Sequence, residues 1–159
     1  MQAITPCLWF ENEALEAAEL YVSLFDDSAI KSVSRLPAAE ASGAGDVFSV
    51  EFSIGGMRVQ ALNGRTSAGF TDAFSLSRTV DSQSEVDRLW SALIAGGGEP
   101  GRCGWLRDPF GISWQIVPTR LGELLSDPDR AAAARVMQAM LSMSKIDIAG
   151  LEAAYSSDD

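Results

Sequence analysis

The stretch "CGWLRDPFGISWQIVP", residues 103–118, contains two β-rich runs separated by "DPFG". Asp in first place, Pro in second and Gly in fourth is the pattern of a type I turn, so two strands joined by a tight turn are predicted here. An earlier pair has the same organisation, because Gly55 and Gly56 separate "VFSVEFSI" (47–54) from "MRVQAL" (57–62). Paired glycines accept the positive φ of the primed hairpin turns, which predicts a second strand pair.

Each strand pair follows a strand and a helix. "ITPCLWF" (4–10) is β-rich, and 12–25 has apolar residues at a helical period, at Leu15, Ala18, Val22 and Phe25. "SAIKSVSRL" (28–36) predicts a further strand, and 37–46 an exposed loop. The order then repeats, with a strand at 73–80, cap-like Asp81 and Ser82, and a helix over 84–98 that ends in glycines.

The two helices match each other at an offset of about 69 residues. The aligned pairs are Glu16 with Glu85, Ala17 with Val86, Leu20 with Leu89, Tyr21 with Trp90, and Leu24 with Leu93. Placing Gly56 on Gly111 also aligns Gln60 with Gln115. An internal repeat is therefore predicted: an α+β fold of two tandem βαβββ modules, about 1–66 and 70–120, with C-terminal helices over about 121–156, all in one domain of 1–159.

The C-terminal segment from about Leu121 has helical character. Asp127 is expected to cap a helix, with Pro128 in its first position and Asp129 in its first turn, and Ser144 to Asp147 resembles a capping box. An apolar stripe is formed by Val136, Met137, Met140, Leu141 and Met143. Core or interface packing is the ordinary role of such a stripe, and a ligand-facing role is the alternative.

Composition excludes several classes of function. A net charge of −10 and a pI near 4.4 argue against nucleic acid and membrane surfaces as partners, and no apolar run approaches the length of a membrane span. The absence of histidine excludes Ser-His-Asp and Cys-His nucleophile systems and imidazole-based metal sites. Cys7 and Cys103 are expected to be reduced thiols in a cytoplasmic protein.

The two βαβββ units, the "DPFG" turn and the opening "ITPCLWF … LYVSLF" together resemble the vicinal-oxygen-chelate superfamily of glyoxalase I, extradiol dioxygenases and antibiotic-resistance proteins. "ALNG" (61–64), "FTDAFSLS" (70–77), 103–118 and 126–155 look like its PhnB-like branch, often labelled 3-demethylubiquinone-9 3-methyltransferase domains. The resemblance implies cupped mixed sheets, a cavity for a small-molecule ligand, and a homodimer.

In the metal-using members, the first and last strands of each unit supply the ligands of one ion. The corresponding places here are Thr5 or Pro6, Gln60, Phe74 or Ser75, and Gln115. Neutral amides and hydroxyls do not offset the lost hydration shell of a divalent ion. We therefore expect no metal and no cofactor, with hydrogen bonding from Gln115 in place of metal chemistry.

The predicted ligand-binding residues are Trp9, Arg58, Gln60, Phe74, Trp105 and Gln115. The alternative for the two glutamines is that both are satisfied amides on a half-exposed sheet. Arg102 and Arg107 lie near Cys103 in the sequence, but without a histidine base a nucleophilic thiol is not favoured. Nothing in the spacing of Asp46, Glu51 and Asp72 identifies a catalytic base.

The function expected from the sequence is binding of a small organic molecule in a metal-free cavity, and whether turnover follows stays open. Three alternatives remain: a methyltransferase as the family label says, a metal-dependent glyoxalase- or dioxygenase-type enzyme, and a drug-sequestration protein. The glycines do not favour the first, because Gly43 and Gly45 precede a strand and Gly96 follows a helix. A nucleoside-cradling turn needs glycines between a strand and a helix.

Overall fold

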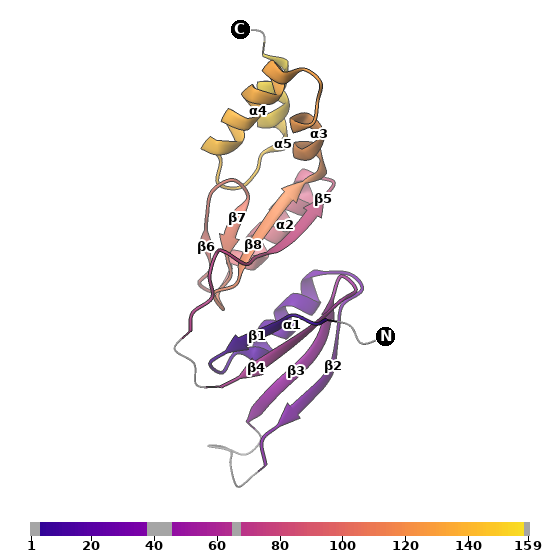
Figure 1. The fold of residues 1–159 in the computed structure, drawn as a ribbon, viewed down its shortest axis with the longest axis vertical. Coiled ribbons are helices and arrows are strands. Elements are labelled where there is room, and N and C mark those ends of the chain that lie inside the picture. Colours follow the sequence, from indigo (N-terminus) through magenta and orange to yellow (C-terminus); the bar gives the residue numbers. More distant parts are fainter. Residues whose placement is uncertain (1–3, 38–45, 65–67, 158–159) are drawn as a thin grey trace. The chain divides into compact units, whose positions relative to one another are not determined.

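The computed structural model describes residues 4–37, 46–64 and 68–157 (Figure 1). The chain divides into two compact units, Met1–Gly69 and Phe70–Asp159. Each unit contains one four-stranded mixed sheet, in the order β1-β4-β3-β2 and β5-β8-β7-β6. The two tandem βαβββ modules and the C-terminal helices are thus confirmed. Among the described residues, no helix combines the length and the apolar character needed to cross a membrane.

The first unit places one helix on one face of its sheet. Its elements are β1 (Cys7–Phe10), α1 (Ala14–Leu24), β2 (Ala29–Arg35), β3 (Val47–Ile54) and β4 (Met57–Asn63). β1 runs parallel to β4, and β3 is antiparallel to β2 and β4. Gly55 and Gly56 have φ of 53° and 79°, which confirms the primed hairpin. The predicted loop 37–46 lies mostly outside the described residues.

The residues that α1 buries differ from the apolar stripe predicted from the helical period of the sequence. The side chains that are fully buried are Ala14, Ala17, Ala18 and Tyr21. Of the predicted stripe only Ala18 is among them, and Leu15, Val22 and Phe25 are half-buried. Alanines on the contact face let the helix lie close to the sheet, so the larger side chains are displaced to its margins. Two of the aligned residues, Ala17 and Tyr21, are buried like their counterparts in the second unit, whereas Leu20 and Leu24 are only half-buried.

The second unit repeats the plan with β5 (Leu76–Val80), α2 (Gln83–Ile94), β6 (Glu99–Pro100), β7 (Trp105–Arg107) and β8 (Ser113–Pro118). The Ser82 hydroxyl accepts from the Glu85 amide, which confirms the predicted helix cap. β5 begins three residues later than predicted, because Phe74 lies in a bend whose amide donates to the Thr71 carbonyl. The two-residue strand β6 was not predicted, since it contains Pro100 and glycines lie on both sides of it.

The "DPFG" turn is a buried polar junction. The Gly111 amide donates to the Asp108 carbonyl at 3.0 Å, which confirms a tight turn. Asp108 is only 3% exposed, and its Oδ1 accepts from the amides of Phe110 (2.9 Å) and Ile112 (3.0 Å). Its Oδ2 accepts from the indole of Trp114 at 2.9 Å. One carboxylate therefore fixes both the turn and the buried tryptophan of β8.

The C-terminal extension consists of α3 (Thr119–Leu125), α4 (Arg130–Ser142) and α5 (Ile148–Ser156). The prediction that Asp127 caps a helix is wrong, because Asp129 caps α4 through bonds to the Ala131 and Ala132 amides. Asp127 instead accepts from the Asp129 amide, in the turn before the helix. Asp147 caps α5, so the predicted capping box starting at Ser144 is also wrong.

The three helices share a small apolar core. Its buried members are Leu121, Leu124, Val136, Ile146 and Leu151. Met140 and Met143 pack against it, so much of the predicted stripe packs in the interior. Met137 and Leu141 remain 38% and 44% exposed. Self-association through these two side chains stays a prediction.

Candidate functional site

Each sheet has one face that its own helix does not cover, and we call it the open face. In the first unit the helix-covered face carries buried Leu8, Phe52 and Val59, among others. Since side chains alternate along a strand, the open face carries their neighbours, including Arg58 and Gln60. In the second unit the same alternation places Trp105, Arg107 and Gln115 on the open face, opposite buried Leu106, Trp114 and Ile116.

Gln60 and Gln115 occupy equivalent positions on these faces. Gln60 lies between Cys7 of β1 and Glu51 of β3. Gln115 lies between Ser77 of β5 and Trp105 of β7. The strand order and the direction of pairing are the same in both units. The alignment of the two glutamines predicted from the sequence therefore corresponds to one structural position that occurs twice.

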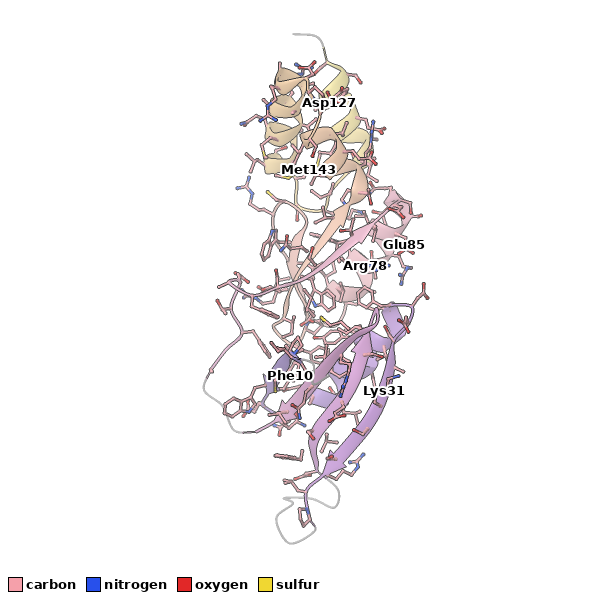
Figure 2. All side chains as sticks on the ribbon, turned by 45° about the vertical axis from the view of Figure 1, so that its right-hand side comes forward. Phe10, Lys31, Arg78, Glu85, Asp127 and Met143 are labelled. Atoms are coloured by element: carbon pink, nitrogen blue, oxygen red, sulfur yellow. The ribbon has the colours of Figure 1, made fainter. Side chains whose placement is uncertain are left out.

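The first unit contains a pocket of about 310 Å³, which we call the first pocket, and its lining includes Arg58 and Gln60 of the open face. It is lined by Thr5, Lys31, Glu51, Phe52, Arg58, Val59 and Gln60. No side chain in the described part of the chain forms an ion pair or hydrogen bond with the side chains of Lys31, Arg58 or Gln60. Figure 2 shows Lys31 on the open side of the sheet. Two cations and one carboxylate give the first pocket a formal charge of +1.

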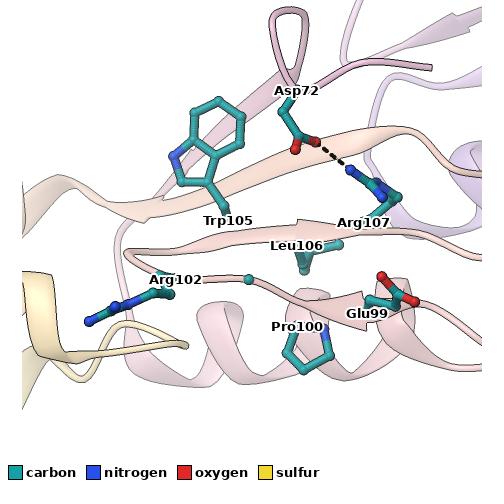
Figure 3. Close-up of a pocket in the computed structure, with 8 residues that line it drawn as sticks. Asp72, Glu99, Pro100, Arg102, Trp105, Leu106 and Arg107 are labelled. Carbon is teal, nitrogen blue, oxygen red and sulfur yellow. Dashed lines mark hydrogen bonds and ion pairs between the residues drawn. The ribbon is translucent and has the colours of Figure 1, made fainter.

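The second unit has its own pocket, of about 400 Å³, called here the second pocket (Figure 3). Its lining residues are Asp72, Glu99, Pro100, Gly101, Arg102, Trp105, Leu106 and Arg107. Arg107 pairs with Asp72 at 2.9 Å, and the Ser113 hydroxyl donates to the same carboxylate. Trp105 and the ion pair lie on one side of β7, whereas Arg102 extends toward the C-terminal helices.

The remaining predicted site residues have distinct positions. Gln115 donates through Nε2 to the Ser75 hydroxyl at 2.8 Å, so Ser75 rather than Phe74 stands beside it. Phe74 is 50% exposed and does not line either pocket. Trp9 is also 50% exposed, and its indole lies against Gly64, outside the first pocket. Ligand contact by Trp9 and Phe74 stays a prediction.

Lys31 is the functional candidate that the sequence reading missed. It lies in β2 at a register shift between Ile30 and Ser32. Such a bulge adds a residue to one strand and breaks the simple alternation of faces. Period-two counting therefore does not reveal that Lys31 lines the same pocket as Arg58.

We predict that Asp72 titrates below its ordinary pKa of 3.8. The hydrogen bond from Ser113, and then that from Arg107, lowers the pKa because both stabilise the carboxylate. The stabilising effect of Asp72 is thus present above the ordinary pKa and is lost as the pH falls through the lowered pKa. Carbon-detected NMR titration should show a midpoint below 3.8 in the wild type, and a rise in Ser113→Ala. A wild-type midpoint at or above 3.8 would contradict this network.

The residues at the family's metal positions do not fit a divalent ion. In residues 4–37, 46–64 and 68–157, no three His, Cys, Asp or Glu side chains gather as a ligand set. The first unit offers Thr5 and Gln60 at these positions, and the second offers Ser75 and Gln115. All four are neutral, so none supplies the negative charge of the carboxylates that usually hold such an ion.

The turns between strands and helices do not fit a nucleoside-type methyl donor either. Residues 11–13 connect β1 to α1, and residues 81–82 connect β5 to α2. Neither connection contains a glycine. A Gly-rich turn that lets the backbone approach a nucleotide is therefore missing from both places.

Comparison with known proteins agrees with this fold. Residues 2–117 match the family model of 3-demethylubiquinone-9 3-methyltransferase. A putative 3-demethylubiquinone-9 3-methyltransferase, PhnB protein, from Bacillus cereus is 32% identical, with a TM-score of 0.67, over 74% of this chain and 100% of that chain. Protein PA1353 from Pseudomonas aeruginosa is 23% identical, with a TM-score of 0.58, over 74% of this chain and 98% of that chain.

A more distant structure shows the same fold. The fosfomycin resistance protein FosX from Mesorhizobium loti is 16% identical, with a TM-score of 0.53, over 79% of this chain and 98% of that chain. No curated protein matches the chain. With the family model covering residues 2–117 and two βαβββ units in place, the chain belongs to the 3-demethylubiquinone-9 3-methyltransferase family, a PhnB-like branch of the vicinal-oxygen-chelate superfamily.

Proposed function

We propose that this protein binds a small organic anion on the open faces of its sheets, without a metal ion. The observation that carries the proposal is the first pocket, where Lys31 and Arg58 have no ion-pair partner among the described residues. The chain as a whole has a net charge of −10, so a pocket with a formal charge of +1 stands out from its surroundings. A carboxylate or similar group fits this pocket because charge-assisted hydrogen bonds are the strongest that the two cations can form.

The neutral polar groups supply orientation. Gln60 lies in the first pocket, where its side-chain donor and acceptor have no partner within residues 4–37, 46–64 and 68–157, and Thr5 adds a hydroxyl. On the second open face the Ser75 bond fixes the Gln115 amide, which directs its oxygen as an acceptor. A few fixed polar groups beside apolar walls are typical of small-molecule sites. The ligand is thus an anion that also carries hydrogen-bonding groups.

Binding rather than proton transfer is the activity that the open faces support best. Asp72 is held ionised by Ser113 and Arg107, and its lowered pKa makes it a poor base at neutral pH. A methyltransferase needs a site for a methyl donor, and a metal enzyme needs a site for a divalent ion. The described residues show no fitting site for either group.

The double variant Gln60→Ala/Gln115→Ala tests the proposal. Native mass spectrometry of the purified protein should show a several-fold loss of the copurifying organic molecule. The melting temperature should change little, because the Gln60 side chain has no hydrogen-bond partner among the described residues. The Gln115 side chain loses one bond, which contributes about 1 kcal/mol. Gln138→Ala, an exposed position on α4, is the matched control. Equal losses of ligand and of folding stability would instead favour satisfied structural amides.

A further inference from the structure

The family model ends at residue 117, within β8, and the C-terminal extension begins just after it at Thr119. About a quarter of the chain has no counterpart in the Bacillus cereus structure, although that structure is covered completely. The extension does not line the second pocket. It does contact the turn that precedes β7, formed by residues 101–104. Gly101 and Arg102 of this turn line the pocket, as do all three residues of β7.

The contact is made by the α4–α5 connection, residues 143–147. The Cys103 amide donates to the Met143 carbonyl at 2.9 Å, and the Gly104 amide donates to the Ser144 carbonyl at 2.8 Å. In return, the Ser144 hydroxyl donates to the Gly101 carbonyl. The turn and the connection are therefore joined by bonds in both directions.

The turn that is held in this way has an unfavourable backbone conformation. Cys103 has φ of 57°, in the left-handed region that residues with a Cβ seldom adopt. Gly104 has φ of 83°, and a Cβ placed on it would lie 3.1 Å from Ile146 Cγ1 and 2.9 Å from the Ile116 carbonyl oxygen. Such a conformation persists only when the surrounding structure enforces it. Here the hydrogen bonds from the α4–α5 connection hold Cys103 and Gly104 in this conformation.

The other side of the connection is fixed to α2. The Gln83 side chain donates to the Ile146 carbonyl at 3.1 Å and accepts from the Ile148 amide at 2.9 Å. Lys145 forms an ion pair with Asp87. Ile146 itself is fully buried. The connection is thus bonded to α2 on one side and to the 101–104 turn on the other.

The pocket wall depends on this turn. The Gly101 amide donates to the Trp105 carbonyl, and the Trp105 amide donates to the Arg102 carbonyl. The guanidinium of Arg102 donates to the Leu141 carbonyl at 2.8 Å, which draws this side chain toward the extension. A shift of the turn therefore moves Trp105, the largest side chain of the second pocket.

We propose that the α4–α5 connection is a positioning element of the second pocket: it holds the 101–104 turn in its left-handed conformation and so sets Trp105 as a wall for the ligand. This inference rests on the proposed function, because a positioned wall serves a ligand. The ligand chemistry that it adds is a flat aromatic ring, which packs on an indole with an offset or meets it edge to face. Residues 143–147 act through the turn and do not touch the ligand.

The test compares Ser144→Ala with Ser142→Ala in the full-length protein. Ser142 is an exposed serine of the same helix end, and its hydroxyl donates only to the Ala139 carbonyl. Ser144→Ala removes the hydroxyl bond to the Gly101 carbonyl and keeps the backbone carbonyls that accept from the Cys103 and Gly104 amides. Because the turn is then held by one hydrogen bond fewer, hydrogen exchange at these two amides should be roughly threefold or more faster in Ser144→Ala. Exchange within α4 and α5 should be equal in both variants. Unchanged exchange at the two amides would overturn the inference.

A second measurement uses benzoate, a flat organic anion, as the probe. We expect benzoate to shift the indole NMR signal of Trp105 in the wild type and in Ser142→Ala, with a severalfold weaker affinity in Ser144→Ala. Equal affinity in all three proteins would overturn the positioning role while leaving the proposed function intact. A wild type that shows no benzoate shift at Trp105, but still copurifies with an organic anion, would restrict binding to the first pocket and overturn the inference.

Discussion

Replacing Asp108 with alanine is expected to lower the free energy of unfolding of the second unit by about 3 kcal/mol or more. The carboxylate is only 3% exposed and accepts bonds from two backbone amides and from the Trp114 indole. Its removal leaves these donors without their partner in the interior, and each unsatisfied donor costs about 1–3 kcal/mol. Urea unfolding followed by circular dichroism measures the change.

Asp108→Asn is the matched variant. The amide oxygen still accepts from the Phe110 and Ile112 amides, and Asn is compatible with the first position of the turn. Only the bond to Trp114 is lost, so the destabilisation should be clearly smaller than that of Asp108→Ala. Equal stability of the wild type and Asp108→Ala would show that Asp108 does not hold the turn.

The double variant Lys31→Gln/Arg58→Gln should weaken binding of small organic anions about 100-fold. A hydrogen bond to a charged group contributes about 1.5–3 kcal/mol, and 1.4 kcal/mol corresponds to a factor of ten. Both cations line the first pocket and lack ion-pair partners among the described residues, so their loss removes ligand contacts without breaking an internal bond. Isothermal titration with a series of small carboxylates, at fixed ionic strength, measures the affinities.

The control for this variant is Arg88→Gln/Arg120→Gln, which removes the same total charge from outside either pocket. Its affinity should stay close to that of the wild type, because exposed charges at a distance are screened by salt. If both double variants lost affinity equally, the net charge of the protein rather than the first pocket would determine anion binding.

Most of the fold was predictable because its signals are local. The paired glycines of β3 and β4, the Ser82 cap and the "DPFG" turn each depend on neighbouring residues, and the structure confirms all three. The internal repeat then gave the architecture, since two copies of one strand and helix order imply two similar sheets. It also gave the equivalent positions of Gln60 and Gln115.

The features that were missed depend on contacts distant in sequence. The bulge at Lys31 is set by pairing with β3, and β6 exists because it pairs with β7. The caps of α4 and α5 were misplaced because several Ser and Asp residues compete for each helix start, and tertiary contacts decide among them. Ser144, for example, donates its hydroxyl to the Gly101 carbonyl instead of capping a helix.

The candidate site shows the same division. Arg58 and Gln60 are both among the ligand-binding residues predicted from the sequence, and both line the first pocket. Family resemblance suggested either Phe74 or Ser75, and only the structure reveals the bond from Gln115 to Ser75. The ion pair of Asp72 with Arg107 joins residues 35 positions apart, which no local pattern indicates.

Native mass spectrometry of the purified protein tests the central claim most directly, because it detects a bound organic molecule and a bound metal ion in one spectrum. We expect chains that carry an organic anion and no divalent ion, since Thr5, Gln60, Ser75 and Gln115 provide no anionic ligand. A mass increment of one divalent metal ion per chain, retained through purification, would contradict this claim.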